Sequence, residues 1–159
     1  MVVMFYSQKA YLNASGKVGI YTLMHDVKRS LADSKIPAGL VTILSSQATT
    51  SVILLENEDD IKQALITHVQ AQFDSAVTAK PSTTPRRSGS GPAAAHTMAA
   101  LTGLTLTLPF VNGRLLTHLQ HEVFALDYEP KSGRREFVIT VMAAPTPPAP
   151  AGAPPPGRR

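Results

Sequence analysis

Residues 45–60, SSQATTSVILLENEDD, decide how the fold is interpreted, because a strand signal and a helix signal meet inside this stretch. TSVILLE, residues 50–56, is apolar and rich in β-branched side chains, as is LVTILSS, residues 40–46, and both segments predict strands. The apolar run then gives way to ENEDD, residues 56–60. These acidic groups either form a chemical site or only separate a strand from a helix.

The helix after this cluster has the clearest periodicity in the chain. Its apolar residues recur every four positions, the spacing of one helix face: Ile61, Leu65, Val69, Phe73 and Val77. Asn57 is a good N-cap, and residues 58–60 then occupy the first turn, where free N–H groups and the helix dipole favour carboxylates. Capping therefore accounts for residues 57–60 but not for Glu56.

The rest of the chain predicts short elements of both kinds. Two more helices are expected, over residues 24–34 and over the alanine-rich residues 93–101, which Gly103 ends. The strand patterns predict three hairpins: residues 2–12 with 18–21, residues 104–111 continued through the Asn112-Gly113 turn, and residues 122–128 with 134–142. We therefore predict an α+β fold, with a mainly antiparallel sheet or sandwich of seven or eight strands and three helices.

The length, 159 residues, suits one compact domain, which we place at residues 1–143. Two segments lack large apolar residues: residues 78–92, expected to be a flexible insertion, and residues 144–159, expected to be a disordered proline-rich tail. The tail is either a spacer or a ligand for a proline-binding module, and the missing flanking arginine favours a spacer. The absence of cysteine excludes disulfides, thiolate nucleophiles and cysteine-bound zinc.

The formal charge of +4 suggests nucleic acid as a partner, but its distribution argues against it. Arg86, Arg87, Arg158 and Arg159 lie in the two low-complexity segments, and without them the chain is close to neutral. There is no tryptophan and no basic stripe rich in aromatic residues. We predict no signal peptide and no membrane span, and therefore a cytoplasmic protein that binds neither nucleic acid nor membrane.

Four segments in order resemble one family: GLVTILSSQATTSVILLENEDD (39–60), AAAHTMAALTGLTLTLPFVNGRL (93–115), EVFALDYE (122–129) and RREFVITVMA (134–143). Together they resemble the YjbQ family of secondary thiamine-phosphate synthases. The resemblance covers about residues 3–143, apart from the insertion. As an ordered set these segments are fairly specific, whereas each one alone is weak.

The resemblance implies a compact α+β fold, homotrimers with sites near the subunit interfaces, and a small phosphorylated substrate. The residues that match the family pattern are Thr49, Thr50, Glu56, Asn57, Asp59 and His96. Histidines donate protons, hydroxyls and helix N-termini hold phosphate oxygens, and a carboxylate acts as a base or holds a divalent metal ion. No cofactor is firmly implied, although a divalent metal is compatible with the pattern.

Three features of the sequence depart from that pattern. The family histidine before the two threonines is replaced by Ala48, and the family Trp-Gln pair falls on Gln120 and His121. The family loop that carries a tyrosine and a histidine is replaced by residues 78–92. Loss of one positioned acid or base typically costs about 10²–10⁴-fold in rate, so these differences bear on the inherited reaction.

Each candidate residue also has a structural interpretation. Thr49 and Thr50 are either phosphate ligands or β-formers at a strand start, and Glu56 is either a site carboxylate or a solvent-facing strand end. His96 is functional by resemblance and would otherwise be an ordinary surface histidine. His118 and His121 could bind zinc together with His96, but on a strand they would point to opposite faces, so we predict no metal site.

Two functions follow from these observations. In the first, the chain carries out thiamine-phosphate-synthase-like chemistry. His96, His121 and Glu56 are then catalytic, and Thr49, Thr50, Asn57 and Asp59 bind substrate. In the second, the chain is a non-catalytic family member that keeps the trimer and serves as a binding or scaffold protein.

Overall fold

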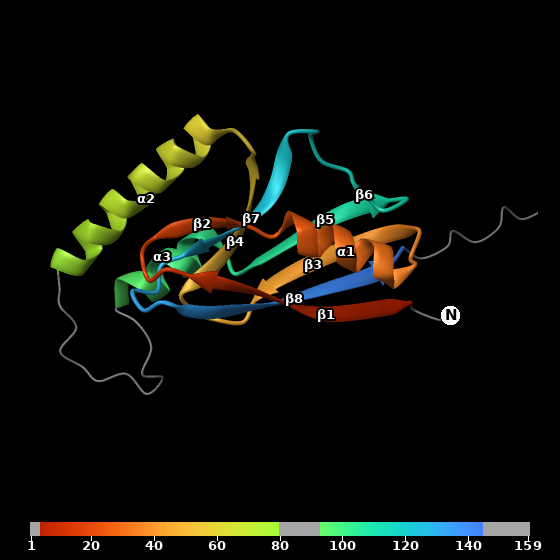
Figure 1. Ribbon diagram of the computed structural model, residues 1–159, viewed down its shortest axis with the longest axis horizontal. Helices are drawn as coiled ribbons and strands as arrows, with labels where there is room; N and C mark the ends of the chain where they lie inside the picture. The colour runs from red at the N-terminus through yellow and green to blue at the C-terminus, as the bar shows by residue number, and fades with distance from the viewer. Residues whose placement is uncertain (1–3, 80–92, 145–159) are drawn as a thin grey trace, which may run out of the picture.

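The computed structural model describes residues 4–79 and 93–144 (Figure 1). Within these ranges the helices are α1 (Met24–Ser34), α2 (Asp59–Ala79) and α3 (Ala93–Thr102). The strands are β1 (Phe5–Ala14), β2 (Gly19–Thr22), β3 (Ala38–Ser45), β4 (Thr50–Glu56), β5 (Thr105–Val111), β6 (Arg114–Leu115), β7 (His121–Asp127) and β8 (Gly133–Ala143). The predicted α+β class is confirmed. The predicted insertion and tail lie outside the described residues except at their ends.

The larger sheet contains five antiparallel strands in the order β1-β8-β3-β5-β6. Its last hairpin follows the predicted turn, with Val111 opposite Arg114. Asn112 and Gly113 both have positive φ, at 51° and 72°, as a two-residue hairpin turn requires. The Asn-Gly signal is therefore confirmed.

The smaller sheet has the order β2-β7-β4, and it is antiparallel as well. Along the β4–β7 pair, Thr50 lies opposite Asp127 at one end and Glu56 lies opposite His121 at the other. This register sets the positions of most candidate site residues.

Two predicted hairpins are wrong, although their strands exist. β1 pairs with β8 and β2 pairs with β7, so both turns carry the chain from one sheet to the other. Turn residues determine where the chain bends, but pairing depends on which strand faces are buried together. The two crossing turns also pack against each other: a Cβ on Gly16 would lie 2.6 Å from the Ser132 backbone nitrogen.

The smaller sheet separates two hydrophobic cores. One core fills the space between the two sheets and α1, with Val27, Ile43, Val123 and Phe137 at its centre. The other lies on the far face of the smaller sheet, where Leu126 and Tyr128 pack against α2 and α3. In Figure 1, α2 and α3 accordingly lie on the side of the smaller sheet. No described element covers the outer face of the larger sheet.

The start of α2 differs from the prediction by about one residue. Asp59 and Asp60 do occupy its first turn, but the Glu58 carbonyl accepts the first helical hydrogen bond, from the Lys62 N–H at 3.0 Å. Glu58 is therefore in the N-cap position. The Asn57 side-chain oxygen instead accepts a hydrogen bond from Lys62 Nζ at 2.8 Å.

No helix within the described ranges combines the length and the apolar character needed to cross a lipid bilayer.

Candidate functional site

Glu56 and His121 meet where β4 ends and β7 begins. They are directly opposite in the antiparallel register, so their side chains share one face of the smaller sheet. His121 Nε2 lies 4.0 Å from Glu56 Oε1, at the limit of an ion pair. The His118 ring contacts the His121 ring edge-on, with centroids 5.5 Å apart. The structure therefore groups two imidazoles and one carboxylate.

A cavity of about 360 Å³ opens beside His121, between α1 and the chain from β6 to β7. Its charged and titratable lining is basic: Lys28 from α1, Arg114 from β6, and His118 and His121. Met24, Leu31 and Leu115 supply apolar walls. A cavity of this size with several cationic groups suits a small anion attached to an organic group.

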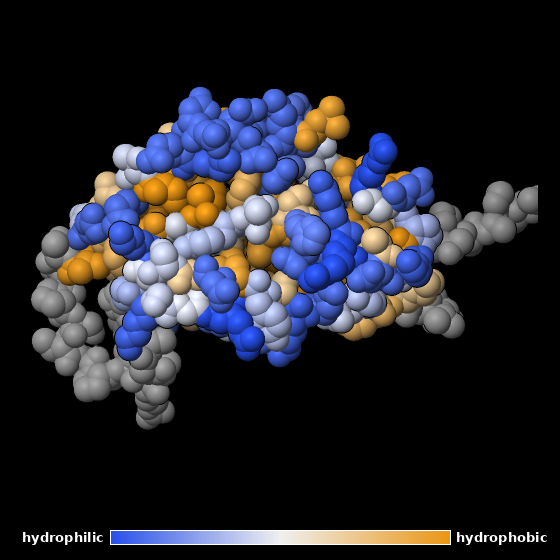
Figure 2. Space-filling view, in the orientation of Figure 1, coloured by the Kyte–Doolittle hydropathy of each residue, from blue (hydrophilic) through white to orange (hydrophobic). Residues whose placement is uncertain are grey.

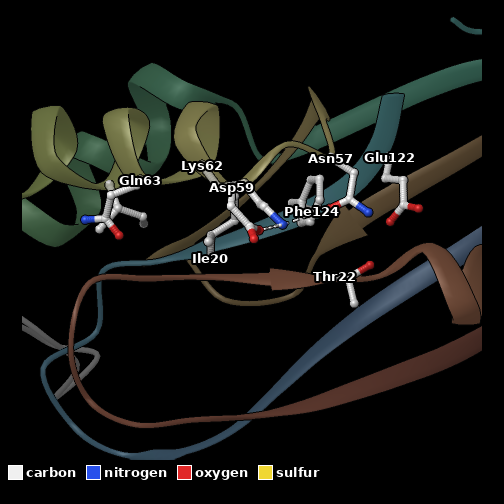
Figure 3. A pocket seen from close by; sticks show the side chains of 9 residues that line it. Ile20, Thr22, Asn57, Asp59, Lys62, Gln63, Glu122 and Phe124 are labelled. Carbon is white, nitrogen blue, oxygen red and sulfur yellow. Dashed lines mark hydrogen bonds and ion pairs between the residues drawn. The ribbon is translucent and has the colours of Figure 1, made fainter. Parts of the chain in front are cut away.

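Asn57 and Asp59 lie on the opposite face, beside a second cavity of about 440 Å³ under α2 (Figure 3). Asp59 forms an ion pair with Lys62 at 2.8 Å, and the hydrogen bond from Lys62 lowers the pKa of the Asp59 carboxyl. Lys62 also lies 5.9 Å from the centre of the Phe124 ring. The two predicted substrate ligands therefore face away from Glu56 and His121.

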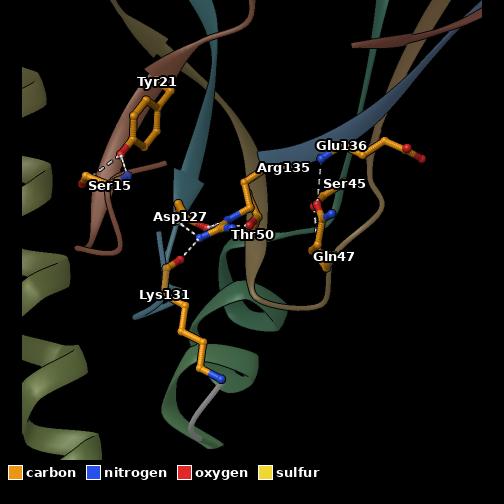
Figure 4. A network of polar contacts seen from close by, with 9 residues as sticks. All are labelled: Ser15, Tyr21, Ser45, Gln47, Thr50, Asp127, Lys131, Arg135 and Glu136. Carbon is orange, nitrogen blue, oxygen red and sulfur yellow. Dashed lines mark hydrogen bonds and ion pairs between the residues drawn. The ribbon is translucent and has the colours of Figure 1, made fainter. Parts of the chain in front are cut away.

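Thr49 and Thr50 are buried at the other end of β4. The Thr50 hydroxyl donates a hydrogen bond to Asp127 Oδ1 at 2.8 Å, and Arg135 holds both oxygens of that carboxylate at 2.8 and 3.0 Å (Figure 4). The hydrogen bonds with Asp127 raise the pKa of the Arg135 guanidinium above its ordinary value. The Thr49 carbonyl accepts a hydrogen bond from the Tyr128 N–H. These contacts tie both threonines to the framework.

Ala48 and His96 are also on the Thr50 side of the molecule. Ala48 is exposed in the turn that precedes β4. His96 is half-buried in α3. The hydroxyl of Thr102, the last residue of α3, donates a hydrogen bond to Ser51 Oγ at 2.8 Å. Figure 1 places α3 beside the start of β4 rather than beside the β6–β7 connection.

The predicted site residues therefore form two groups within one chain. Glu56, Asn57, Asp59 and His121 surround one end of the smaller sheet, whereas Thr49, Thr50 and His96 lie toward the other. Thr50 and Glu56 are the two ends of β4, and the rise of an extended strand places them about 20 Å apart. No single small substrate can contact both groups of one chain.

The expectation that His118 and His121 point apart is wrong, because His118 lies in the turn before β7 rather than on a strand. This turn brings the two rings into contact. Across the residues that the structure describes, no three His, Asp or Glu side chains gather closely enough to hold a metal ion.

Lys28 and Arg114 were missed by the sequence analysis. Lys28 follows the buried Val27 on α1, and nothing in the helix pattern distinguishes it from an ordinary surface lysine. Arg114 belongs to the NGRL segment, where the Asn-Gly turn was the dominant signal. Only the packing of α1 against the β6–β7 region brings the two cations together.

The fold defines the class, a small α+β protein, and the basic cavity beside His121 is its candidate site. The model of the UPF0047 protein YjbQ-like family matches residues 8–144, and the chain belongs to this family. A comparison with the curated proteins finds no match.

Several solved structures share the fold. A YbjQ-like protein of unknown function from Sulfolobus solfataricus has a TM-score of 0.76 and 16% identity, covering 90% of this chain and all of its own. A hypothetical protein from Aeropyrum pernix has a TM-score of 0.71 and 15% identity, covering 87% and 99%. A conserved hypothetical protein from Thermus thermophilus has a TM-score of 0.63 and 21% identity, covering 84% and 98%.

Proposed function

We propose that the chain is an enzyme of the thiamine-phosphate-synthase type, which binds a small phosphorylated substrate in the cavity beside His121. The observation that carries this proposal is the basic lining of that cavity, with Lys28, Arg114, His118 and His121 around about 360 Å³. Lysine and arginine bind phosphate oxygens through charge-assisted hydrogen bonds. A cytoplasmic location, as predicted from the sequence, is part of this proposal.

His121 is the proton-transfer group of this proposed site. An imidazole both donates and accepts protons near neutral pH, and its place in the cavity gives it access to a bound phosphate. Glu56 Oε1 lies 4.0 Å from His121 Nε2, beyond hydrogen-bond distance, so in this proposal Glu56 acts on the ring through its charge. His118 fixes the ring from the other side by edge-on contact.

His96 completes the site from a neighbouring subunit. Because His96 lies toward the far end of the smaller sheet, it reaches the cavity of another copy rather than that of its own chain, whereas the buried Thr49 and Thr50 only hold the start of β4 in place. We therefore propose a homo-oligomer, as the predicted trimer requires, with one group of site residues contributed by each of two adjacent subunits.

The outer face of the larger sheet is the surface proposed for this assembly. Neighbouring strands there bring large apolar side chains into one row across the sheet: Phe5 and Leu40 each lie opposite Met142, and Leu40 also lies opposite Pro109. Phe5, Leu40 and Met142 are 64%, 46% and 41% exposed. Such a patch marks an interaction surface.

This face carries few charges, and Lys9 and Glu136 neutralise each other, which favours another copy of the same chain over a strongly charged partner. Lys9 forms an ion pair with Glu136 at 3.1 Å, and the Arg134 guanidinium lies 4.4 Å from the centre of the Tyr11 ring. Little net charge is left to attract a partner of opposite sign.

The test is formation of thiamine phosphate from the pyrimidine pyrophosphate and the thiazole phosphate. We expect activity in the natural chain, a loss of about 10²–10⁴-fold in His121→Ala, and a comparable loss in His96→Ala. His25→Ala is the matched control, since His25 is exposed on α1 and does not line the cavity. Activity that survives in both site variants would contradict the proposal.

The exposed methyl group of Ala48 favours the second candidate, a binding or scaffold protein without catalysis. Restoring the family histidine separates the two functions. If the natural chain is silent and Ala48→His is active, the chain keeps the scaffold of an enzyme but has lost its chemistry. The arginine-bearing insertion and the proline-rich tail, which this second function would use, lie outside the described residues.

A further inference from the structure

Two leucines in the connection between β6 and β7 lie open to water. Leu116 is 60% exposed and Leu119 is 100% exposed. The Leu116 N–H donates a hydrogen bond to the Pro109 carbonyl at 2.9 Å. The His121 N–H donates to the His118 carbonyl at 3.0 Å, so Leu119 is at the tip of a hydrogen-bonded turn. In Figure 2 hydrophobic atoms project from the molecule where Figure 1 shows this connection.

An exposed leucine needs no explanation by itself, but Leu119 also lines the basic cavity beside His121. The facing wall of that cavity is α1, from which Met24, Lys28 and Leu31 contribute to the lining. Their spacing along the chain places these three side chains on one face of the helix. On this wall a cationic side chain is therefore flanked by two apolar ones.

The wall formed by the chain from β6 to β7 has the same mixed character. Arg114 is followed by Leu115, His118 is followed by Leu119, and all of these residues line the cavity. Inorganic phosphate would contact the cations alone and leave the apolar side chains of both walls in water. A wholly apolar ligand would instead remove the cations from water without pairing them, which is costly. The cavity therefore fits a ligand with an anionic part and an apolar part.

Lys28 and Arg114 are left for an anion from outside the chain. No ion pair among the described residues includes either of them. Asp26, the acidic residue nearest to Lys28 along α1, is paired with Arg29 at 2.7 Å. A phosphate that enters the cavity therefore meets two cations that no described carboxylate neutralises.

We propose that Leu119 determines which organic phosphates the cavity accepts, and that it selects those whose organic group is apolar. The phosphate lies against Lys28 and Arg114, and the organic group lies against Leu119 at the mouth of the cavity. This inference rests on the proposed function, since it requires that the cavity bind phosphate. A phosphate ester of a sugar or a polyol binds less well, because its hydroxyl groups find no hydrogen-bond partner on the leucine.

The test compares two ligands, benzyl phosphate and glycerol phosphate, by isothermal titration calorimetry with the full chain. Both are phosphate monoesters, but only benzyl phosphate carries an apolar group. We expect the natural chain to bind benzyl phosphate about tenfold more tightly, since burial of a leucine side chain contributes at least that factor. Leu119→Ser should remove the preference by weakening benzyl phosphate about tenfold while the affinity for glycerol phosphate stays the same.

Two further variants separate the roles of charge and apolar contact. Lys28→Met keeps the length of the side chain but removes its charge, so it should weaken both ligands by the same factor, about tenfold. Leu101→Ser is the matched control, because Leu101 is 77% exposed on α3 and does not line the cavity. It should bind both ligands as the natural chain does.

The outcomes distinguish this inference from the proposed function. Equal affinity of the natural chain for the two ligands would overturn the inference and leave the phosphate site standing. A preference that survives in Leu119→Ser would overturn it as well. A lower molecular mass of Leu119→Ser in light scattering would also do so, since Leu119 would then contact a second copy of the chain.

The proposed function can fail while the inference holds. In that case the natural chain and Ala48→His both prefer benzyl phosphate, and the preference depends on Leu119, but neither protein forms thiamine phosphate. Failure of the natural chain to bind either ligand would overturn both.

Discussion

At the scale of single residues, the ion pair between Asp127 and Arg135 is a buried polar contact that joins β7 to β8. Both side chains are buried, and two hydrogen bonds join them in a bidentate arrangement. Thr50 adds a third hydrogen bond to the carboxylate. A threonine pair that the sequence presents as candidate phosphate ligands thus also has a structural role in positioning β4 on β7.

Asp127→Asn removes the charge that compensates Arg135 and leaves a buried guanidinium without its partner. We expect a loss of about 3–5 kcal/mol in the free energy of unfolding, measured by urea denaturation. Thr50→Val is the matched comparison, since it removes only one hydrogen bond and should cost about 1 kcal/mol. Equal losses of stability in the two variants would show that the ion pair contributes no more to stability than a single hydrogen bond does.

The Lys9–Glu136 pair gives the protein a pH-dependent contribution to stability. Its hydrogen bond with Lys9 lowers the pKa of Glu136 from the ordinary 4.5 and raises the pKa of Lys9 from the ordinary 10.5. The stabilising contribution is therefore complete between these ordinary values. It is lost as pH falls through the lowered pKa of Glu136, and lost again as pH rises through the raised pKa of Lys9.

Glu136→Gln accordingly lowers the melting temperature at pH 7 but not at a pH below the folded-state pKa of Glu136. Both side chains are partly exposed, so the difference at pH 7 is small and shrinks in 1 M salt. Thermal unfolding of the natural chain and the variant at the two pH values measures it. A melting-temperature difference that is independent of pH and salt would exclude the ion pair as its cause.

At the scale of helices and strands, the sequence predicts the elements well and their pairing less well. The four-residue spacing from Ile61 to Val77 predicts α2, and the Asn112-Gly113 turn predicts the β5–β6 hairpin, because both signals are local. The partners of β1 and β2 could not be predicted in the same way. They depend on which strand faces meet in the core between the sheets.

Prediction of the site from the sequence has the same limit, because it depends on how the elements pack together. The resemblance identified Glu56 and His121, which the register of β4 and β7 does bring together. Lys28 could not be predicted, because its place in the cavity depends on how α1 packs against the β6–β7 region. The split between the Glu56 group and the His96 group was equally invisible, since spacing along the chain carries no information about opposite ends of a sheet.

Gly39 tests how closely β3 and β8 must approach. A Cβ at this position would lie 1.8 Å from the Met142 carbonyl oxygen, which belongs to the neighbouring backbone and cannot rotate away. We expect Gly39→Ala to destabilise the protein by about 1–3 kcal/mol or more. Gly113→Ala is the control for a substitution that strains the backbone without a steric clash, because Gly113 has positive φ but open space around it. Chemical denaturation measures the free energy of unfolding of both variants. A smaller loss of stability in Gly39→Ala than in Gly113→Ala would contradict this account.

At the scale of the whole molecule, one chain is too small to unite the predicted site. Thr50 and Glu56, which belong to the two different groups, lie about 20 Å apart at the two ends of β4, and the larger sheet leaves an apolar face uncovered by any described element. The proposed self-association through that face would bury the apolar row, and the proposed shared site would take its second group of residues from another copy.

Leu40→Glu places a charge in the middle of the apolar row, next to Met142 and Pro109. Because an unpaired charge is costly to bury, we expect the variant to run as a monomer in multi-angle light scattering, while the natural chain runs as a trimer. The variant should keep its far-ultraviolet circular dichroism, since Leu40 is half exposed in the monomer. The same mass for both proteins would remove this face from the assembly.

The most direct test of the shared site mixes two inactive subunits. Glu56→Gln and His96→Ala are each prepared alone, then unfolded together and refolded as mixed oligomers. Thiamine phosphate formation by the mixed oligomers is then compared with that of the unsubstituted protein. If the natural chain is inactive, all variants are made in the Ala48→His background. Random mixing leaves about one shared site in four intact, so the account predicts recovery of about a quarter of the parental activity. If the mixture stays as inactive as its two components, the site is not shared between subunits.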